Sequence, residues 1–451
     1  MGARVSCFGG SGERLKPTPE TLKPSSQGES TYSLSDLPLR YVMIVDGSTI
    51  SEQSRCGKGT FGVVHTATEV CEVDDKVSRR VAAKRSRKET ESDALRNERS
   101  ILSNLDHPHI IKIYGITGGP CPSQIMEICD VELFSLISSN GALSEEVAQN
   151  YFRQVMMALN YLHSVMRIVH RDIKPENILL NTTRSVVKLC DFGTAVKLGT
   201  GRGSRASGRT GSLSYAAPEV YVSSLSDFSS DIWSAGVLLY VMKCGASPFR
   251  NPDDANPEKA AVERVKRGKL NTSRPKWKDM SAGPKRLILK LLQVDASQRP
   301  NAAEVLGDRW LFKPVEKEKL ENVGRNVAKC LEKFTAIGDP EIRACWLGLS
   351  SQMGDWDHAR EMFEIADSDM DGILGFGDLT LLGFPSSVSK YTFSYSEFTA
   401  ALLLDLDEVG RRELLTPIAP FAFKAVGSDL ASITDFASFK RIILSDVHYS
   451  T

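Results

Sequence analysis

The sequence predicts an α+β protein with more than one domain, because successive regions of the chain carry different patterns. At 451 residues the chain is longer than one ordinary domain, and two or three domains are expected. Short strand-forming runs divided by turn residues follow Tyr41, whereas amphipathic helical patterns dominate from about Asn150. An acidic region from about Pro340 is predicted to be a separate, all-α domain.

The composition is that of a soluble globular protein, with 41% hydrophobic and 25% charged residues. The nine cysteines form no CxxC pair, which indicates free thiols in a reducing, cytoplasmic environment. The longest apolar candidate, residues 232–242, is interrupted by Ser234 and Gly236 and is predicted to be a buried core helix. The first ten residues lack the apolar stretch of a secretory signal.

The formal net charge of zero conceals an asymmetry along the chain. Residues 340–451 contain 17 acidic and 8 basic residues, a balance of −9, so the rest of the chain has a balance of +9. Such an acidic domain can be attracted to a basic body, and divalent ions would weaken that attraction. The alternative is that both are ordinary solvated surfaces, and charge alone does not decide between them.

The first 40 residues are rich in Ser, Thr, Pro and Gly and are predicted to form a mostly disordered arm. After the first strand-forming runs, Leu95, Ile101 and Leu105 are spaced among charged residues as on one face of a helix.

A glycine-rich stretch, GKGTFGVV, occupies residues 57–64 and has the pattern G-x-G-x-x-G-x-V. Glycines let a backbone approach phosphate groups closely, and Val64 can cover a base. The same glycine spacing occurs in dinucleotide-binding folds, but there a helix follows directly, whereas here a second strand-like run follows. The candidate nucleotide-binding residues of this stretch are Cys56, Gly57, Lys58, Gly59, Thr60, Phe61, Gly62, Val63 and Val64.

Further along the chain, Lys84 ends the stretch VAAK, and Glu98 on the following predicted helix is its natural partner. Each alone is more simply explained as a surface charge. The stretches HRDIKPEN (170–177), DFG (191–193) and APE (217–219) then follow in order. Six such elements in this order and spacing are not expected by chance.

On these motifs, residues 41–312 resemble a eukaryotic protein kinase catalytic domain, which implies a bilobal fold with a β-rich N-lobe and a helical C-lobe. The resemblance implies ATP and Mg²⁺ as cofactors and proteins as substrates. It gives Asp172 the role of accepting the proton of the substrate hydroxyl, and Lys174 that of steadying the γ-phosphate, as in serine/threonine kinases. It assigns the two Mg²⁺ ions to Asn177 and Asp191, and phosphate pairing to Lys84.

The same resemblance implies supporting roles. Met126, Glu127 and Cys129 match the linker that receives the adenine. Glu219 is expected to pair with Arg299, and Asp231 to brace the catalytic loop. Glu132 and Glu176 match positions that favour basic residues near the substrate Ser or Thr, although they could serve only ribose contact and local structure. Arg171 often binds a loop phosphate in this family, but Gly208 stands where the phosphorylated residue is usual, so activity without loop phosphorylation is a hypothesis.

Residues 367–378, DSDMDGILGFGD, have the spacing of an EF-hand calcium loop. Gly372 permits the sharp turn at the sixth position. An aspartate stands at the twelfth position, where glutamate usually chelates with both oxygens, so weak calcium binding or tolerance of Mg²⁺ is expected. The candidate metal ligands are Asp367, Asp369, Asp371, Asp378 and the backbone oxygen of Ile373.

A partner loop is expected at 386–397, with Phe393 at the position of the short β-bridge between paired hands. Lys390 would place a cation where the ion sits, so this loop is predicted to be structural. A third candidate, 426–437, begins with Val426 and lacks ligating side chains at key positions, so it is predicted to be vestigial.

The order of kinase domain, helical junction and EF-hands resembles the calcium-dependent protein kinases of plants and apicomplexan parasites. The expected segments are an arm (1–40), a kinase domain (41–312), a junction or autoinhibitory helix (313–339) and a degenerate EF-hand domain (340–451). Spacings of three and four put five apolar residues on one face of the junction helix: Leu320, Val323, Val327, Leu331 and Phe334. That face can exchange partners when calcium binds, or it can pack permanently beneath the large lobe.

One weak site in place of the family's usual four predicts shallow, weak or absent calcium dependence. The alternatives are therefore a calcium-independent kinase with structural EF-hands and a catalytically idle scaffold. The completeness of five residues argues against the scaffold: Lys84, Glu98, Asp172, Asn177 and Asp191.

The first residues, MGARVS, fit the pattern for myristoylation of Gly2, and Cys7 lies close enough to receive palmitate. Because one myristoyl chain holds a membrane only marginally, a second acyl group would matter for membrane association. The alternative is a chance match of a loose pattern. No nucleic-acid partner is expected, and the chain is predicted to be a monomer.

Overall fold

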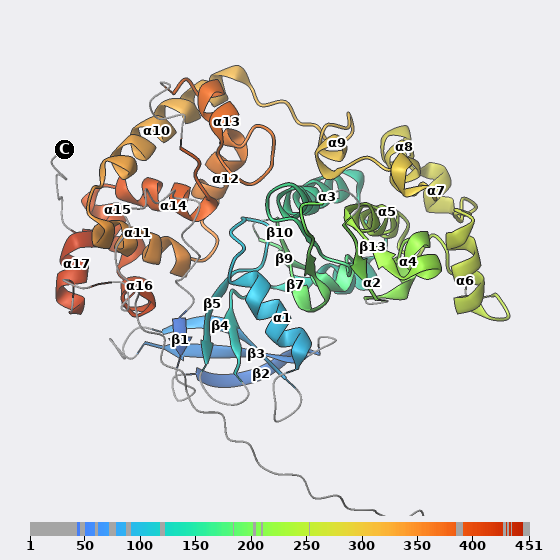
Figure 1. Ribbon diagram of the computed structural model, residues 1–451, viewed down its shortest axis with the longest axis horizontal. Helices are drawn as coiled ribbons and strands as arrows, with labels where there is room; N and C mark the ends of the chain where they lie inside the picture. Colours follow the sequence, from blue (N-terminus) through green and yellow to red (C-terminus); the bar gives the residue numbers. More distant parts are fainter. Residues whose placement is uncertain are drawn as a thin grey trace, which may run out of the picture.

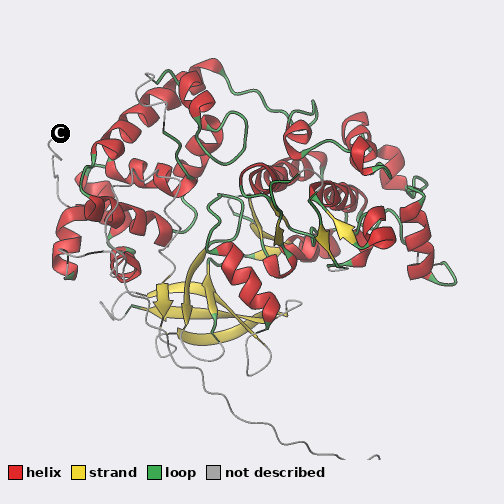
Figure 2. Ribbon diagram, in the orientation of Figure 1, coloured by secondary structure: helices red, strands yellow, loops and turns green. Residues whose placement is uncertain are grey.

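The computed structural model contains a two-lobed body with a helical tail beside it (Figure 1). Strands form the smaller lobe, and helices form most of the larger lobe and the tail (Figure 2). The structure describes residues 43–45, 50–58, 62–71, 78–86, 92–117, 122–183, 185–201, 204–208, 211–251, 253–384, 391–426, 430, 433 and 435–444. The predicted N-terminal arm lies outside these residues. Within them, no helix has the length and apolar character needed to cross a membrane.

The smaller lobe is a six-stranded sheet with helix α1 (Asp93–Leu102) beside it. The strand order is β1-β5-β6-β4-β3-β2, with β1 parallel to β5 and the other neighbours antiparallel. Helix α1 begins where the Ser92 hydroxyl accepts the N–H of Leu95, at 3.3 Å, and its buried face includes Leu95 and Leu102. The strands are β1 (Met43–Val45), β2 (Ile50–Lys58), β3 (Gly62–Val70), β4 (Ser78–Ser86), β5 (Ile113–Thr117) and β6 (Gln124–Met126).

Helix α5 (Phe228–Cys244) runs through the core of the larger lobe, and every residue from Ser230 to Cys244 is buried. This confirms the predicted core helix at 232–242, because a helix that is apolar on all sides must be covered on all sides. It begins at an Asp227–Ser230 capping box and ends at Gly245, whose φ of 71° needs a residue without Cβ. The other helices are α2 (Leu133–Asn140), α3 (Glu145–Asn160), α4 (Pro218–Ser223), α6 (Pro257–Lys266), α7 (Pro275–Asp279), α8 (Ala282–Leu291) and α9 (Ala302–Leu306).

Short strands also occur in the larger lobe. They form one three-stranded sheet of order β10-β9-β7 and two pairs, β11 with β8 and β12 with β13. Their bounds are β7 (Val131–Glu132), β8 (Ile168–Val169), β9 (Ile178–Asn181), β10 (Val186–Leu189), β11 (Val196–Lys197), β12 (Ala206–Ser207) and β13 (Leu225–Ser226).

The tail is all-helical and has its own core. The long helix α10 (Lys317–Ala336) packs on α12 and α14. Four residues of its predicted apolar face are buried in the tail core and Leu320 is half-buried; the four are Val323, Val327, Leu331 and Phe334. The remaining tail helices are α11 (Pro340–Gln352), α12 (Asp357–Ala366), α13 (Phe376–Leu381), α14 (Tyr395–Leu404), α15 (Glu408–Leu415), α16 (Ala419–Val426) and α17 (Phe436–Leu444).

The tail also completes a small apolar cluster of the strand lobe. Phe421 and Ala425 of α16 share this cluster with residues of β3 to β6, and α16 lies beside β1 (Figure 1). The Arg79 guanidinium lies 4.2 Å from the ring centres of both Tyr114 and Phe421. It also donates to the backbone oxygen of Gln352, at 3.0 Å. The tail therefore contacts the smaller lobe through apolar side chains and through Arg79, which interacts with residues of both parts.

Candidate active site

The lysine–carboxylate cluster forms at the junction of the sheet and helix α1. Strand β4 places the Lys84 Nζ 2.8 and 2.7 Å from the two oxygens of Glu98, and 3.1 Å from Asp191 Oδ1. Both Lys84 and Glu98 are almost completely buried. Burial alone would lower the pKa of Lys84, but the charges of Glu98 and Asp191 outweigh it and hold this pKa above its usual value. Lys84 is therefore a fixed cation.

The catalytic loop, residues 170–177, brings two other predicted residues, Lys174 and Asn177, to the Asp172 carboxylate. Its Oδ2 accepts from Lys174 Nζ at 2.7 Å and from Asn177 Nδ2 at 2.9 Å, and its Oδ1 accepts from the Ser212 N–H at 2.7 Å. Burial would raise the pKa of Asp172, but the bonds and charge of Lys174, with the Ser212 N–H, bring the pKa below its usual value. The carboxylate is therefore ionised near neutral pH and can act as a base.

Helix α5 supports this loop through Asp231, which is fully buried. Its oxygens accept the backbone N–H groups of His170 and Arg171, both at 2.8 Å, and lie 2.9 Å from His163 Nε2. Arg171 has a φ of 67°, a left-handed conformation that costs energy for a residue with a side chain. The predicted brace thus holds a strained turn directly before Asp172.

The DFG segment is held by a residue that the sequence reasoning missed. Asn97, next to Glu98 on α1, donates from Nδ2 to the backbone oxygens of Phe192 and Gly193, both at 3.3 Å, and of Ala195, at 2.9 Å. Asp191 itself has a left-handed φ of 65°. The position of Asn97 next to Glu98 was the one sequence signal for this role. A helix that positions the partner of Lys84 can also position the DFG turn.

A cavity of about 190 Å³ separates the lobes at this site. Val64, Ala82 and Met126 line it with apolar groups, and Asn177 and Asp191 line it with oxygen-bearing groups. A purine fits the apolar part, and the amide and carboxylate oxygens suit Mg²⁺, which prefers hard oxygen ligands. Glu127, Cys129, Glu132 and Glu176 also line the cavity.

Part of the predicted phosphate-binding stretch lies outside the described residues, namely Gly59, Thr60 and Phe61. Cys56, Gly57 and Lys58 belong to β2, but their side chains are likewise not described. Gly62 begins β3, where an added Cβ would lie 2.5 Å from the backbone oxygen of Arg85 on the neighbouring strand. Glycine is therefore required at this position by the close approach of β4.

The activation segment, residues 191–219 from the DFG to the APE motif, is held against the catalytic loop by the side chains of Arg171 and Lys174. Arg171 donates from Nε to the Thr194 oxygen at 2.6 Å and from Nη1 to the Ser207 oxygen at 3.1 Å. The Ser212 hydroxyl accepts from Lys174 at 2.8 Å, a contact that the sequence reasoning did not anticipate. At Gly211, an added Cβ would lie 2.2 Å from the Arg171 oxygen, so the segment can approach this closely only with glycine there.

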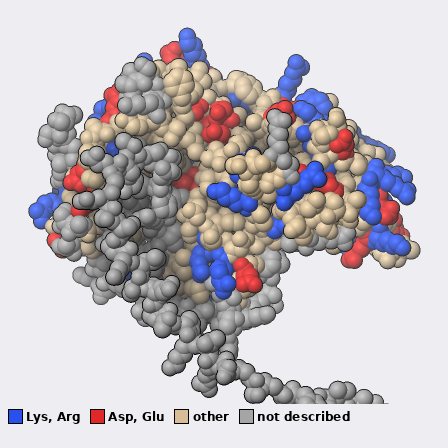
Figure 3. All heavy atoms as spheres, in the orientation of Figure 1, with Lys and Arg blue, Asp and Glu red and all other residues tan. Residues whose placement is uncertain are grey.

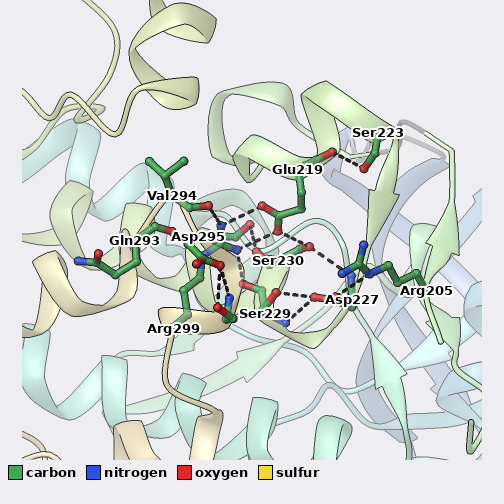
Figure 4. A network of polar contacts seen from close by, with 12 residues as sticks. Arg205, Glu219, Ser223, Asp227, Ser229, Ser230, Gln293, Val294, Asp295 and Arg299 are labelled. Atoms are coloured by element: carbon green, nitrogen blue, oxygen red, sulfur yellow. Dashed lines mark hydrogen bonds and ion pairs between the residues drawn. The ribbon is translucent and has the colours of Figure 1, made fainter. Parts of the chain in front are cut away.

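The predicted ion pair of Glu219 with Arg299 forms between the start of α4 and the segment that follows α8 (Figure 4). The pair is bidentate, with both oxygen–nitrogen distances at 2.8 Å, and the Ser230 hydroxyl also donates to Glu219, at 2.8 Å. Burial would raise the pKa of Glu219, but Arg299 lowers it below its usual value. This network ties α4 to the start of α5.

The predicted EF-hand loop lies between α12 and α13, where acidic side chains gather on the surface (Figure 3). Oxygens of Asp367, Asp369 and Asp371 lie within 4.8 Å of one another. Burial and the neighbouring carboxylates raise the pKa of Asp367 and raise that of Asp371 to about 6. Crowded like charges of this kind fit a hard cation, which would relieve their repulsion.

Asp378 is not one of the three residues whose oxygens cluster, although its charge contributes to the raised pKa of Asp367 and Asp371. Its carboxylate accepts the backbone N–H groups of Ser368, at 2.8 Å, and Gly375, at 2.9 Å, and it therefore caps α13. Ile373 follows the acidic residues, and its N–H donates to Asp371 at 2.9 Å. Three of the four predicted carboxylates thus come together, and the fourth stabilises the loop.

The expected bridge between paired hands is present, because Leu374 and Phe393 exchange backbone hydrogen bonds of 2.9 and 3.1 Å. The first residues of the partner loop, including Lys390, lie outside the described residues, as do several of the third loop. The predicted acylation sites, Gly2 and Cys7, also lie outside them.

Two lobes enclose a buried lysine, an asparagine and an aspartate that suit Mg²⁺, and a further aspartate held by the catalytic loop. This arrangement defines a protein kinase. Residues 50–311 match the family model of the protein kinase domain, so the chain belongs to the protein kinase family. It is 34% identical to calcium-dependent protein kinase 3 of Plasmodium berghei over 63% of this chain and 47% of that protein. It is 36% identical to a calcium/calmodulin-dependent protein kinase of Emericella nidulans over 56% of this chain and 60% of that protein.

Other matches reach into the tail. The chain is 28% identical to calcium-dependent protein kinase 16 of Oryza sativa over 79% of this chain and 64% of the rice protein. The chain spans about half the length of the Plasmodium relatives that it matches. It is thus a protein kinase similar to the calcium-dependent type.

Proposed function

We propose that the chain is an active serine/threonine protein kinase, which transfers the γ-phosphate of ATP to hydroxyl groups of protein substrates. The observation that carries this proposal is a set of five hydrogen-bonded residues: Lys84, Glu98, Asn177 and Asp191 line one cavity, and Asp172 bonds Asn177. A binding scaffold needs no such set, because phosphoryl transfer is what requires positioning together with charge neutralisation.

Each group then has one task. Lys84, held by Glu98, pairs with ATP phosphates, and Asp172 orients the substrate hydroxyl and accepts its proton. The lowered pKa of Asp172 keeps it available as a base. Lys174 bonds both Asp172 and Ser212, so it positions the γ-phosphate relative to the activation segment. Mg²⁺, when bound, neutralises phosphate charge, and Asn177 and Asp191 would hold it.

An Asp172→Asn variant tests this assignment. We expect kcat for a Ser/Thr peptide with Mg²⁺ and ATP to fall by about 10²–10⁴, which is the usual contribution of a general base. The matched control is Asp93→Asn, an exposed aspartate on α1, which should leave kcat unchanged. A wild-type protein that is folded but transfers no phosphate would refute the proposal and favour a scaffold.

We also propose a preference for basic residues near the phosphorylated Ser or Thr. Glu132 and Glu176 both line the cavity, and burial together with the charge of Glu176 raises the pKa of Glu132. Among the described residues, Oε2 of Glu176 is buried without a hydrogen-bond partner. A substrate Arg or Lys would supply the missing charge. A peptide library with proline-directed or acidic selection would contradict this preference.

Activity without phosphorylation of the activation segment is a further part of the proposal. The support is that backbone oxygens of Thr194 and Ser207 already occupy the Arg171 guanidinium. Phosphatase treatment should therefore leave the rate of phosphate transfer unchanged. A loss of activity that ATP pre-incubation restores would show that a loop phosphate is needed.

For the tail, we propose one weak cation site that makes the kinase calcium-responsive. The carboxylates of Asp367, Asp369 and Asp371 and the backbone of Ile373 would hold the ion. Because Asp378 is engaged with Ser368 and Gly375, its contribution is weakened and affinity should be low. Calorimetric titration should find one site, with a Kd of about 10⁻⁵ M or weaker. Several high-affinity sites would contradict this.

Membrane association through Gly2 and Cys7 is proposed from the sequence pattern alone. A Gly2→Ala variant should lose membrane fractionation in cells, and an unchanged distribution would refute the proposal. We also propose that the chain is a monomer with four segments. They are the arm (1–40), the kinase domain (41–312), the junction helix (313–339) and the EF-hand domain (340–451).

A further inference from the structure

The EF-hand loop is packed directly against the kinase body. Met370 and Ile373 pack on the hydrophobic core of the larger lobe. An added Cβ on Gly372 would lie 2.7 Å from His107 Cδ2 and 2.8 Å from Tyr161 Cδ2, two buried aromatic residues of the body. The glycine of this loop is thus required by contact with the kinase, in addition to its turn, whose φ is 84°.

One buried side chain of the body bonds the loop backbone. Asn160, the last residue of α3, is 2% exposed. Its Nδ2 donates to the Met370 oxygen at 2.8 Å and to the Asp369 oxygen at 3.4 Å. Its Oδ1 accepts from the Ser164 hydroxyl at 3.0 Å, which fixes the direction of the amide. Met370 is also contacted through its Sδ by Arg153, at 3.1 Å.

The other side of the same backbone is held by the candidate ligands. The Asp367 carboxylate accepts the N–H of Asp371 at 3.1 Å and that of Gly372 at 2.9 Å. Residues 369–372 are therefore fixed between Asp367 on one side and Asn160 on the other. Any change in how the carboxylates are arranged must move a segment that the kinase body holds.

We propose that the larger lobe is part of the support of the cation site: docking on Asn160 pre-organises the loop, and a bound cation in turn strengthens the docking of the tail. The inference rests on the proposed cation site in residues 367–378. Because coupling is reciprocal, the factor by which the cation strengthens docking equals the factor by which docking strengthens cation binding, so a variant that removes the coupling contact must weaken cation binding. Asn160 is a positioning residue here, since it reaches the ion only through the loop backbone.

Calcium titration calorimetry of the full chain tests the coupling, with Asn160→Ala compared to Asn150→Ala. Asn150 lies on the same helix α3 and bonds Ser185 of the body, at 3.5 Å, instead of the tail. We expect Asn160→Ala to raise the Kd about fivefold or more, the low end of typical couplings, and Asn150→Ala to leave it unchanged. Equal affinity in all three proteins would overturn the inference.

Met370→Gly separates docking from local loop strain and does not depend on the folding of the Asn160 variant. Met370 has a left-handed φ of 56°, so glycine should favour the loop conformation and tighten binding if the loop acts alone. The proposal predicts the opposite, a raised Kd, because the Met370 side chain supplies contacts with the body. Tighter binding by Met370→Gly would overturn it.

The two levels of the proposal fail differently. If the wild-type chain binds no calcium, the proposed cation site is wrong and the inference falls with it. If the wild type binds calcium at one site and both variants bind equally well, the site stands and only the coupling is refuted. A second readout is thermal unfolding, where calcium should raise the Tm of the wild type more than that of Asn160→Ala.

Discussion

Asp231 illustrates at the scale of one residue how this site is built. A carboxylate without exposure to solvent is costly unless its oxygens are bonded, and here they accept two backbone N–H groups and contact His163. Its bonds hold the left-handed Arg171, which sets the direction of Asp172. The spacing of the motifs predicted these residues, because their roles require fixed positions in short loops.

Other residues of the site could not be read from the sequence. Asn97 donates to backbone oxygens, whereas Ser212 accepts through its hydroxyl and donates its backbone N–H. Many residue types at many positions can make such contacts. The roles of these two residues depend on how the helix α1 and the activation segment approach the catalytic loop. No local sequence pattern predicts that approach, because it depends on tertiary packing.

The Glu219–Arg299 pair gives a prediction about pH. The folded pKa of Glu219 is lowered, so its contribution to stability is complete above the ordinary glutamate pKa of about 4.3 and is lost as pH falls through the lower folded pKa. Urea unfolding should show Glu219→Gln less stable than wild type at pH 7. The difference should shrink in acid below pH 4.3, and a gap that is independent of pH would contradict the assignment.

At the scale of elements, α10 shows what helical periodicity does and does not determine. The three-and-four spacing predicted an apolar face, and the face is buried as expected. The sequence left two alternatives for what covers this face. Either the face exchanges partners when calcium binds, or it packs permanently beneath the large lobe. In the structure the cover is α12 and α14 of the tail, because an apolar stripe specifies burial but not a partner.

Leu331→Ala tests the packing of α10 within the tail. Leu331 is fully buried in the tail core, so its truncation should destabilise the tail by about 2–5 kcal/mol. The control is Lys319→Ala on the exposed part of the same helix, which should be close to neutral. Hydrogen exchange should accelerate in α12 and α14. If it accelerates in the larger lobe and not in the tail, α10 packs on the kinase in solution.

At the scale of the whole molecule, the tail and the kinase body meet along a seam of polar contacts in which both parts supply donors and acceptors. Lys112 donates to the Ser350 oxygen at 2.6 Å, and Lys188 lies 3.9 Å from Asp355. The body also supplies an acceptor, because the Asp106 carboxylate accepts the N–H of Ser396 at 2.7 Å and its hydroxyl at 2.8 Å. The place of the seam could not be predicted, since net charge carries no direction.

Phe421 is the apolar anchor of that seam. It is 1% exposed and lies in the apolar cluster of the strand lobe, so Phe421→Ala should cost about 3–5 kcal/mol of docking and packing energy. Phe376→Ala is the matched control, because Phe376 is 65% exposed on the same tail. Amide exchange in β3 to β6 should rise only in the Phe421 variant. Equal exchange in both would mean that the tail does not rest on this lobe.

The most direct test of a calcium-responsive serine/threonine kinase is phosphate transfer from ATP to a basic Ser/Thr peptide. It compares excess chelator with a calcium titration at constant Mg²⁺, in wild type and in Asp371→Asn. We predict a shallow rise with calcium in the wild type, because one site cannot give steep activation, and a flat response in the variant. Transfer that is equal with chelator and with saturating calcium would contradict the account.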